Sequence, residues 1–307
     1  MIITVTLNPA IDQTVYIDNF QVNEVNRIKK IRKDIGGKGI NVSQNLNNLK
    51  KDNRCVTILG GINGEFIKRE LKRQNFNSKI FEVNDEVRVN LKVVDLKKKT
   101  FTDINEPGFT ISKDMSINII DSIVSIAKPK DIVVLSGSVP KGFKSNVYKE
   151  LIEKLKCKTI LDASGNLLME GIQGKPYLIK PNINELMELL GKETIDSEEE
   201  IISAARELIE QGIQMIVVSL GSEGSIYVTK DRTLKMEGKK VNVKSTVGAG
   251  DSMVAALAMA IEENYSLEEM AEFASAVSTA SIMSEGSVPG NLEVIKKLMN
   301  NGGNNGN

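Results

Sequence analysis

Histidine is absent from this chain of 307 residues. A general base that works near neutral pH must therefore be a carboxylate, a lysine, a tyrosine or a cysteine. Cysteine occurs only twice, as Cys55 and Cys157, far apart and outside any C-x-x-C spacing. We expect two buried thiols in a reducing compartment, which form neither a disulfide nor a zinc site.

Net charge is also lacking, because 40 basic residues balance 40 acidic ones. This balance argues against nucleic acid or an anionic membrane as the main partner, although it leaves room for a local basic cleft. The longest uninterrupted apolar run, residues 253–261, is too short to cross a membrane. No basic segment of a signal peptide precedes the first apolar run, so we expect a soluble cytoplasmic protein.

Short apolar runs that are typical of buried strands alternate with helical patterns along most of the chain. The runs include residues 2–7, 55–59, 131–137, 159–162 and 215–220. This alternation predicts an α/β fold with a mostly parallel central sheet and helices on both faces. Ligands bind beyond the carboxyl ends of such strands, and the polar motifs described below all follow a strand, so we expect one common site.

The most informative motif is Thr246-Val-Gly-Ala-Gly-Asp251, which runs directly into the apolar helical pattern of residues 252–261. A helix N-terminus attracts an anion, and glycines let the backbone approach it closely. Asp251 lies beside that anion and can accept a proton. An ordinary helix start is the alternative. An anion site next to a carboxylate predicts phosphoryl transfer to a hydroxyl group.

A second glycine cluster, Gly36-Gly-Lys-Gly39, precedes a polar helix expected at residues 41–49. It is either an anion-binding turn or a plain turn, and no Walker A sequence occurs in the chain. Asn41 either caps this helix or binds a hydroxyl group. Asp12, after the turn at Asn8-Pro9, either holds two sugar hydroxyls or stabilises the turn itself.

Three cations, Arg27, Lys38 and Arg88, occur in otherwise polar stretches. They are solvated surface residues unless a lid folds over the site, where they would clamp a phosphate group. Asn182 and Glu185 form either a helix cap or a site for hydrated Mg²⁺. Residues 219–224 form either a hairpin turn or a glycine turn along a nucleotide.

Two stretches, Gly36-Gly-Lys-Gly-Ile-Asn-Val42 and Ser245-Thr-Val-Gly-Ala-Gly-Asp-Ser-Met253, together resemble the two signatures of the ribokinase-like (PfkB) family of carbohydrate kinases. The resemblance extends from Thr4 to about Gly290. Residues 4–12, 24–27, 88–92, 102–108 and 135–140 are most similar to members that phosphorylate fructose 1-phosphate. Members that phosphorylate tagatose 6-phosphate share several of these stretches.

This resemblance implies one kinase domain over residues 1–298, with a small β-sheet lid from about residues 13–33 and 87–105. Lids of the family often pair edge to edge, which implies a homodimer and would cover the exposed edges. The low-complexity end, residues 299–307, is expected to be disordered.

The resemblance also implies ATP and Mg²⁺ as cofactors, and it assigns roles to the motifs. Asp251 would be the catalytic base, aided by Gly248, Ala249 and Gly250. The phosphosugar would contact Asp12, Arg27, Gly37, Lys38, Gly39, Asn41, Arg88, Lys92 and Ser138. ATP would contact Lys180, Ser219, Gly221, Ser222, Glu223, Gly224 and Gly250, with Mg²⁺ near Asn182 and Glu185.

Other functions compete with this interpretation. A kinase of a free sugar or a nucleoside would have no use for the phosphate-binding cations. A phosphosugar or nucleotide sensor would have no use for Asp251 as a base. A dinucleotide-dependent oxidoreductase is disfavoured because no G-x-G-x-x-G follows the first strand.

Overall fold

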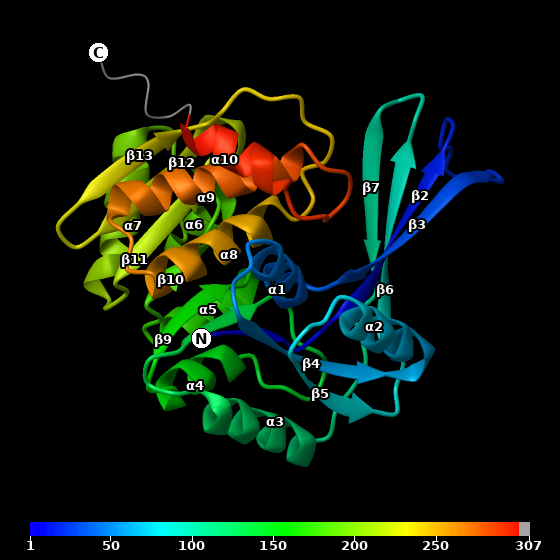
Figure 1. The fold of residues 1–307 in the computed structure, drawn as a ribbon, viewed down its shortest axis with the longest axis horizontal. Coiled ribbons are helices and arrows are strands. Elements are labelled where there is room, and N and C mark those ends of the chain that lie inside the picture. Colours follow the sequence, from blue (N-terminus) through cyan, green and yellow to red (C-terminus); the bar gives the residue numbers. More distant parts are fainter. Residues whose placement is uncertain (301–307) are drawn as a thin grey trace.

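The computed structural model describes residues 1–300. Figure 1 shows a large sheet between two layers of helices, and a small sheet that projects from one side. The order of the large sheet is β13-β12-β11-β10-β9-β8-β1-β4-β5, parallel from β11 to β5. Its strands are β1 (Ile2–Thr6), β4 (Asn53–Gly60), β5 (Ser78–Val83), β8 (Ile132–Ser136), β9 (Lys158–Asp162), β10 (Leu178–Ile179), β11 (Met215–Ser219), β12 (Gly224–Thr229) and β13 (Thr233–Glu237). The predicted, mostly parallel α/β architecture is confirmed.

Two hydrophobic clusters, one on each face of the sheet, hold the helices in place. Successive side chains of a strand point to opposite faces, so Ile2 of β1 belongs to one cluster and Ile3 to the other. One face carries α1 (Lys38–Asn48), α8 (Ala249–Glu262), α9 (Leu267–Ile282) and α10 (Leu292–Asn300). The other carries α2 (Gly61–Arg73), α3 (Lys113–Ile126), α4 (Val147–Lys154), α5 (Gly165–Ile172), α6 (Ile183–Leu190) and α7 (Glu198–Glu210).

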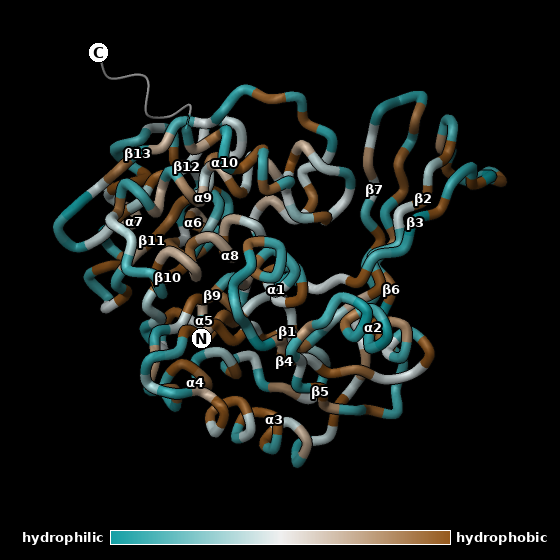
Figure 2. Tube along the Cα trace, viewed as in Figure 1, coloured by the Kyte–Doolittle hydropathy of each residue, from teal (hydrophilic) through white to brown (hydrophobic). Residues whose placement is uncertain are grey.

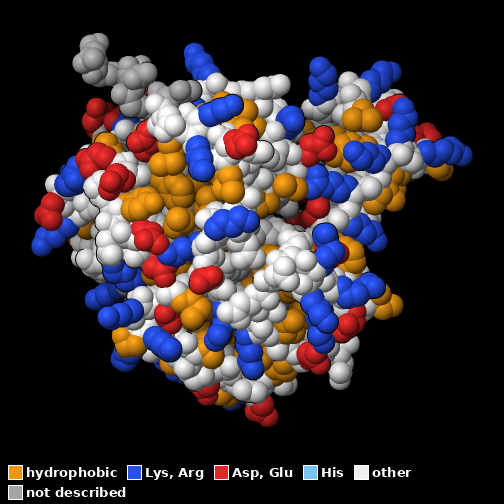
Figure 3. All heavy atoms as spheres, viewed as in Figure 1, with side chains coloured by type: hydrophobic (Ala, Val, Ile, Leu, Met, Phe, Trp, Pro, Cys, Tyr) orange, Lys and Arg blue, Asp and Glu red, His pale blue; other side chains and the backbone are white. Residues whose placement is uncertain are grey.

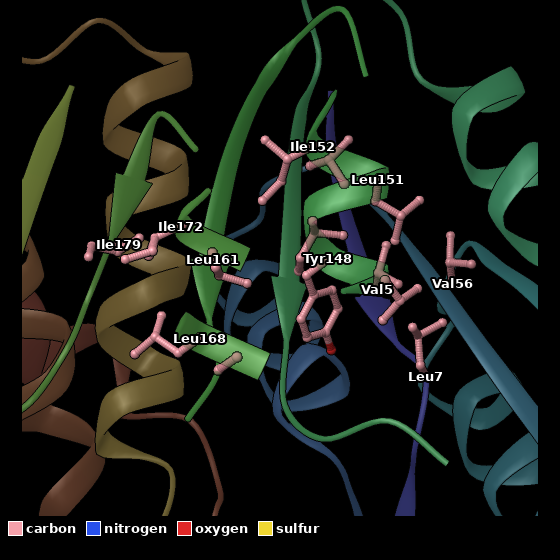
Figure 4. Close-up of a cluster of buried hydrophobic side chains, with 14 of the residues drawn as sticks. Val5, Leu7, Val56, Tyr148, Leu151, Ile152, Leu161, Leu168, Ile172 and Ile179 are labelled. Atoms are coloured by element: carbon pink, nitrogen blue, oxygen red, sulfur yellow. The ribbon is translucent and has the colours of Figure 1, made fainter. Parts of the chain in front are cut away.

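The core is apolar where the sheet meets these helices. Figure 4 shows Tyr148 and Leu151 of α4 lying over Val5 of β1, with Leu161 of β9 beside them. All four side chains are fully buried. Figure 2 shows the same distribution along the chain, with hydrophobic segments at the centre of the large sheet. This apolar support fixes the strand ends at which the site is built.

The small sheet is the lid, and its order is β3-β2-β6-β7. Its strands are β2 (Ala10–Ile17), β3 (Ile28–Gly36), β6 (Arg88–Asp95) and β7 (Thr100–Asn105), which overlap the two segments expected to form a lid. The turn at Asn8-Pro9 joins β1 directly to β2, and Gly37 joins β3 directly to α1. The lid therefore rises straight out of the carboxyl end of the central sheet.

Several local expectations differ from the structure. The helix expected at residues 41–49 begins at Lys38, so Lys38 and Gly39 lie in its first turn rather than before it. The sequence analysis named no element over β5, α3, α5, α9 or α10. The expected tail, residues 299–307, starts inside α10, and residues 301–307 lie outside the described residues. Within residues 1–300, no helix is both long and apolar enough to span a bilayer.

Candidate active site

Asp251 lies in the first turn of α8, which begins at Ala249. Gly248 caps this helix with φ of 78°, a left-handed conformation that glycine adopts without strain. The Asn41 amide group donates a hydrogen bond to Asp251 Oδ2 at 2.7 Å. Asn41 Oδ1 is buried and has no partner among the described residues. Asn41 thus orients the carboxylate and keeps an acceptor free for a hydroxyl group.

Asp251 is almost completely buried. Burial, together with the nearby charge of Asp162, raises the pKa of Asp251 to about 6, against the opposing influence of Lys38, Asn41 and Lys180. A carboxylate with this pKa is ionised at neutral pH and is a stronger base than an ordinary aspartate. Asp251 can therefore deprotonate a hydroxyl group that lies beside an anion bound at the helix N-terminus.

Asp162 is a site residue that the sequence analysis did not identify. It is the last residue of β9, and its side chain is 2% exposed. Lys38 Nζ lies 3.2 Å from Asp162 Oδ2, and Lys180 Nζ lies 3.6 Å from Oδ1. Burial alone would raise the pKa of Asp162, but the two ammonium groups outweigh it and lower that pKa. The only sequence signal was its position at the end of a predicted strand.

The lid supplies a second carboxylate, Asp12 of β2. Its Oδ1 accepts a hydrogen bond from the Asn90 amide of β6 at 3.0 Å, so it is held by a neighbouring strand. A side chain at Gly36 would collide with this carboxylate, which explains the glycine there. Burial raises the pKa of Asp12, although Asn90 and Arg88 oppose the shift. Asn90 was not predicted, although it faces the same side of β6 as Arg88 and Lys92.

Arg88 lies at the base of the lid and is held by three oxygens. Its Nη1 donates to the Glu106 carbonyl at 2.9 Å, and its Nη2 lies 3.3 Å from both the Asn8 carbonyl and Ser138 Oγ. The Asn8 amide also donates to Ser138 Oγ at 3.1 Å. Arg88 Nε is buried without a partner among the described residues, so one donor of this guanidinium group is unsatisfied.

A pocket of about 730 Å³ lies between the polar face of the lid and the turn that leads to Gly248. Asp12, Asn90 and Lys92 line it from the lid, and Thr246 and Val247 line it from the body. In Figure 3, Lys and Arg side chains cover much of the lid beside it. The remaining members of the predicted phosphate clamp differ in position. Lys92 pairs with Asp103 at 3.3 Å, Lys38 pairs with Asp162, and Arg27 lies in an exposed loop that does not line the pocket.

The predicted nucleotide residues gather at the neighbouring strand ends. Asn182 and Glu185 form a capping box at the start of α6, as the structural alternative expected, with bonds of 2.9 and 3.0 Å. Ser219 donates its backbone N–H to the Pro181 carbonyl at 2.9 Å, so the two segments adjoin. The hairpin between β11 and β12 contains the short 3-10 helix Gly221–Glu223.

A role for Asn182 and Glu185 toward Mg²⁺ stays a prediction. Among residues 1–300, no three Asp, Glu, His or Cys side chains gather into a metal site. A cation held by water and phosphate oxygens needs fewer protein ligands than that. Glu185 is also close enough to Lys38 to help raise the pKa of that lysine, although burial acts the other way. The single carboxylate of Glu185 near Lys38 is compatible with a hydrated Mg²⁺ ion.

Comparison with known proteins agrees with this geometry. A family model described as pfkB family carbohydrate kinase matches residues 5–293. The chain is 36% identical to the 1-phosphofructokinase of Bacillus subtilis over 88% of each protein. It is 33% identical to the tagatose-6-phosphate kinase of Staphylococcus epidermidis over 93% of each.

Solved structures match over nearly the whole chain as well. Phosphofructokinase-2 from Escherichia coli in complex with potassium has a TM-score of 0.92 at 29% identity, and its tetrameric inhibited form has a TM-score of 0.89 at 29% identity. Each comparison covers 98% of both chains. The predicted ribokinase-like fold is thereby confirmed over 98% of the chain.

Proposed function

Because the chain belongs to the pfkB family of carbohydrate kinases, a family of phosphotransferases with an alcohol group as acceptor, we propose that it phosphorylates fructose 1-phosphate with ATP. The product is fructose 1,6-bisphosphate. The observation that carries the proposal is the position of Asp251 at the glycine-rich start of α8. The Asn41 amide orients its carboxylate through a hydrogen bond of 2.7 Å. The 36% identity to a 1-phosphofructokinase supports this choice of substrate.

Asp251 accepts the proton of the attacking sugar hydroxyl. Its pKa of about 6 keeps it ionised at neutral pH, and Asn41 fixes its direction. At the start of α8 the Gly250 backbone N–H has no helical partner, and the Ala249 N–H makes only a long bond of 3.4 Å to the Thr246 carbonyl. Both N–H groups stabilise charge on the phosphoryl group in transit. ATP supplies that phosphoryl group when bound.

The phosphosugar binds in the pocket under the lid. Asp12 and Asn41 hold its hydroxyl groups, while Gly37 and Gly39 let the backbone beside it pack closely against Thr6 of β1. Arg88, whose Nη2 lies beside Ser138 and whose Nε has no partner among the described residues, binds the existing phosphate, and Lys92 assists from the wall of the pocket. Arg27 is not part of this cluster in a single chain. The lid limits the access of water and so limits hydrolysis of ATP.

ATP extends from Gly248–Gly250 to residues 219–224, along the adjoining strand ends. Lys180 lies next to Gly250, since its Nζ is 3.4 Å from where a side chain on Gly250 would begin. Asn182 and Glu185 are next to Ser219, where Mg²⁺ would be held chiefly by phosphate oxygens and water. Magnesium would neutralise phosphate charge there.

The lid also supports a homodimer. Val22, Val25, Ile28, Ile31 and Ile104 are all exposed on the lid, Val22 by 85% and Ile31 by 53%. The strand register places Ile31 in one row with Val15 and Val93, on the face turned away from Asp12. Pairing of two lids would bury this exposed apolar face. The exposed residues therefore support a dimer in which the lids meet through their faces as well as their edges.

The experiment is coupled ADP release with Mg-ATP against fructose 1-phosphate, tagatose 6-phosphate, fructose 6-phosphate and free fructose. We expect the highest kcat/KM with fructose 1-phosphate. A preference for tagatose 6-phosphate, which the 33% identity to such a kinase makes the second candidate, would keep the chemistry and change the substrate. Tight binding without turnover of any of them would refute the kinase proposal.

A further inference from the structure

Two lysines in the site share one carboxylate. Lys38 begins α1, Lys180 follows β10, and both ammonium groups lie against Asp162 at the end of β9. Lys180 is 7% exposed and Lys38 is 39% exposed, so the pair reaches from the interior to the open site. A lysine carries a point charge on a flexible stem and needs a partner to stay in one place.

The two ammonium groups lie beside the start of α8. Lys180 Nζ adjoins Gly250, and the stem of Lys38 lies against Gly137, at 3.6 Å from the place of a Cβ there. The charges of both lysines influence the pKa of Asp251. Two cations and the N–H groups at the start of the helix therefore border the position of the transferring phosphoryl group.

We propose that Asp162 is a positioning residue for phosphoryl transfer, whose single buried carboxylate holds Lys38 and Lys180 beside the start of α8. This inference rests on the proposed function. Asp162 does not contact the phosphoryl group, because its side chain is 2% exposed and lies beneath the two lysines. The sequence analysis had assigned Lys38 to the sugar phosphate and Lys180 to the nucleotide. The shared carboxylate places both lysines at the point of transfer.

Asp162 has a second effect, on the base itself. Asp251 is surrounded by Asp162 from β9, by Lys38 and Asn41 from α1 and by Lys180 after β10, while Glu185 of α6 faces Lys38. The two carboxylates and the two ammonium groups cancel in charge. Loss of the Asp162 charge leaves both cations facing Asp251, which favours its ionised form. The pKa of Asp251 therefore falls when Asp162 is neutralised.

The test compares Asp162→Asn, Asp162→Glu and, as a control, Asp131→Asn. Asp131 is also a buried carboxylate, but it lies at the opposite end of the strands and accepts a bond from the Lys128 backbone. The first readout needs no substrate. Carboxyl ¹³C NMR of the ligand-free protein follows the titration of Asp251, whose signal is assigned by its loss in Asp251→Asn. We expect a lower pKa in Asp162→Asn and a nearly unchanged one in Asp162→Glu and Asp131→Asn.

The second readout is turnover at pH 8, where Asp251 is ionised in every variant. We expect kcat to fall about 100-fold in Asp162→Asn, the usual cost of a small misplacement of reacting groups. Lys180→Met should then cost far less in the Asp162→Asn background than in the wild type, because one unit is already broken. If Asp162→Asn does not fold, the same comparison is made in Asp162→Ser, which also removes the charge.

An equal cost of Lys180→Met in both backgrounds would overturn the inference, as would an unmoved titration of Asp251 in Asp162→Asn. A wild-type protein that turns over no phosphosugar would refute the proposed function instead. The NMR titration would still show in that case whether Asp162 controls the charge at Asp251.

Discussion

Replacement of Asp251, the proposed catalytic base, should make the protein more stable while it destroys activity. Burial raises the pKa of Asp251 from 3.8 to about 6 in the folded chain. Above pH 6 the carboxylate is ionised in both the folded and the unfolded state, and folding then carries the full cost of the shift. A shift of this size corresponds to about 3 kcal/mol. Asp251→Asn removes the charge and therefore this cost.

The pH dependence gives the expected sign. Well below pH 3.8 the carboxyl group is protonated in both states, so the folded state has no penalty there. The penalty develops as the pH rises from about 4 to about 6, because the unfolded state loses its proton first. Asp251→Asn should thus gain up to about 3 kcal/mol at pH 7.5, or a melting temperature higher by roughly 5 °C, and much less at pH 4.5.

The assay is thermal unfolding of the ligand-free protein at pH 7.5 and pH 4.5, beside coupled ADP release. Turnover of Asp251→Asn should fall by about 10²–10⁴, the usual contribution of a general base, while the phosphosugar still binds. Asp52→Asn, at an exposed carboxylate, is the control and should change neither quantity. A variant that is less stable than wild type at pH 7.5, or that turns over normally, would contradict the reasoning.

Three further changes test other parts of the site. Arg88→Ala should raise KM for the phosphosugar at least 10-fold with a smaller change in kcat, since it removes a charged donor, and an unchanged KM in steady-state assays would rule out the phosphate role. Gly36→Ala should also raise KM about 10-fold or more, because the new methyl group displaces the Asp12 carboxylate, and titration calorimetry should show weaker binding of the phosphosugar. Ile31→Glu should convert the proposed dimer to a monomer in sedimentation experiments, and a dimer that persists would exclude this face of the lid.

The sequence predicted those features that local patterns specify. The alternation of strands and helices specified the parallel sheet, and the position of Asp12 and Asp251 after apolar strand patterns pointed to one site beyond its carboxyl edge. The start of α8 was readable because glycines and an acid precede a long apolar run. These signals arise within a few residues, so one sequence suffices to read them.

The rest of the site depends on tertiary contacts. Asp162 has a role only because Lys38 and Lys180, both distant in sequence, meet at the end of β9, and no local pattern marks such a meeting. Asn182 and Glu185 show the converse difficulty, because their spacing suits a helix cap and a metal site equally well. The first turn of α1 was missed because glycines usually disfavour helix, whereas Gly39 lies there against β1, where a side chain would not fit.

Because the lid is joined directly to the body, the chain contains lid segments that contact the pocket and body segments that contain Asp162, Lys180 and Asp251. The segments that contain β2, β3, β6 and β7 bring Asp12 and Lys92 to the pocket and Arg88 to Ser138, while Asp162, Lys180 and Asp251 all come later in the chain. A hybrid that takes only the lid strands from a relative would inherit that relative's pocket wall and keep its own machinery for phosphoryl transfer. Substrate preference can thus diverge by substitution in two short early segments, without any change in the residues that perform the reaction.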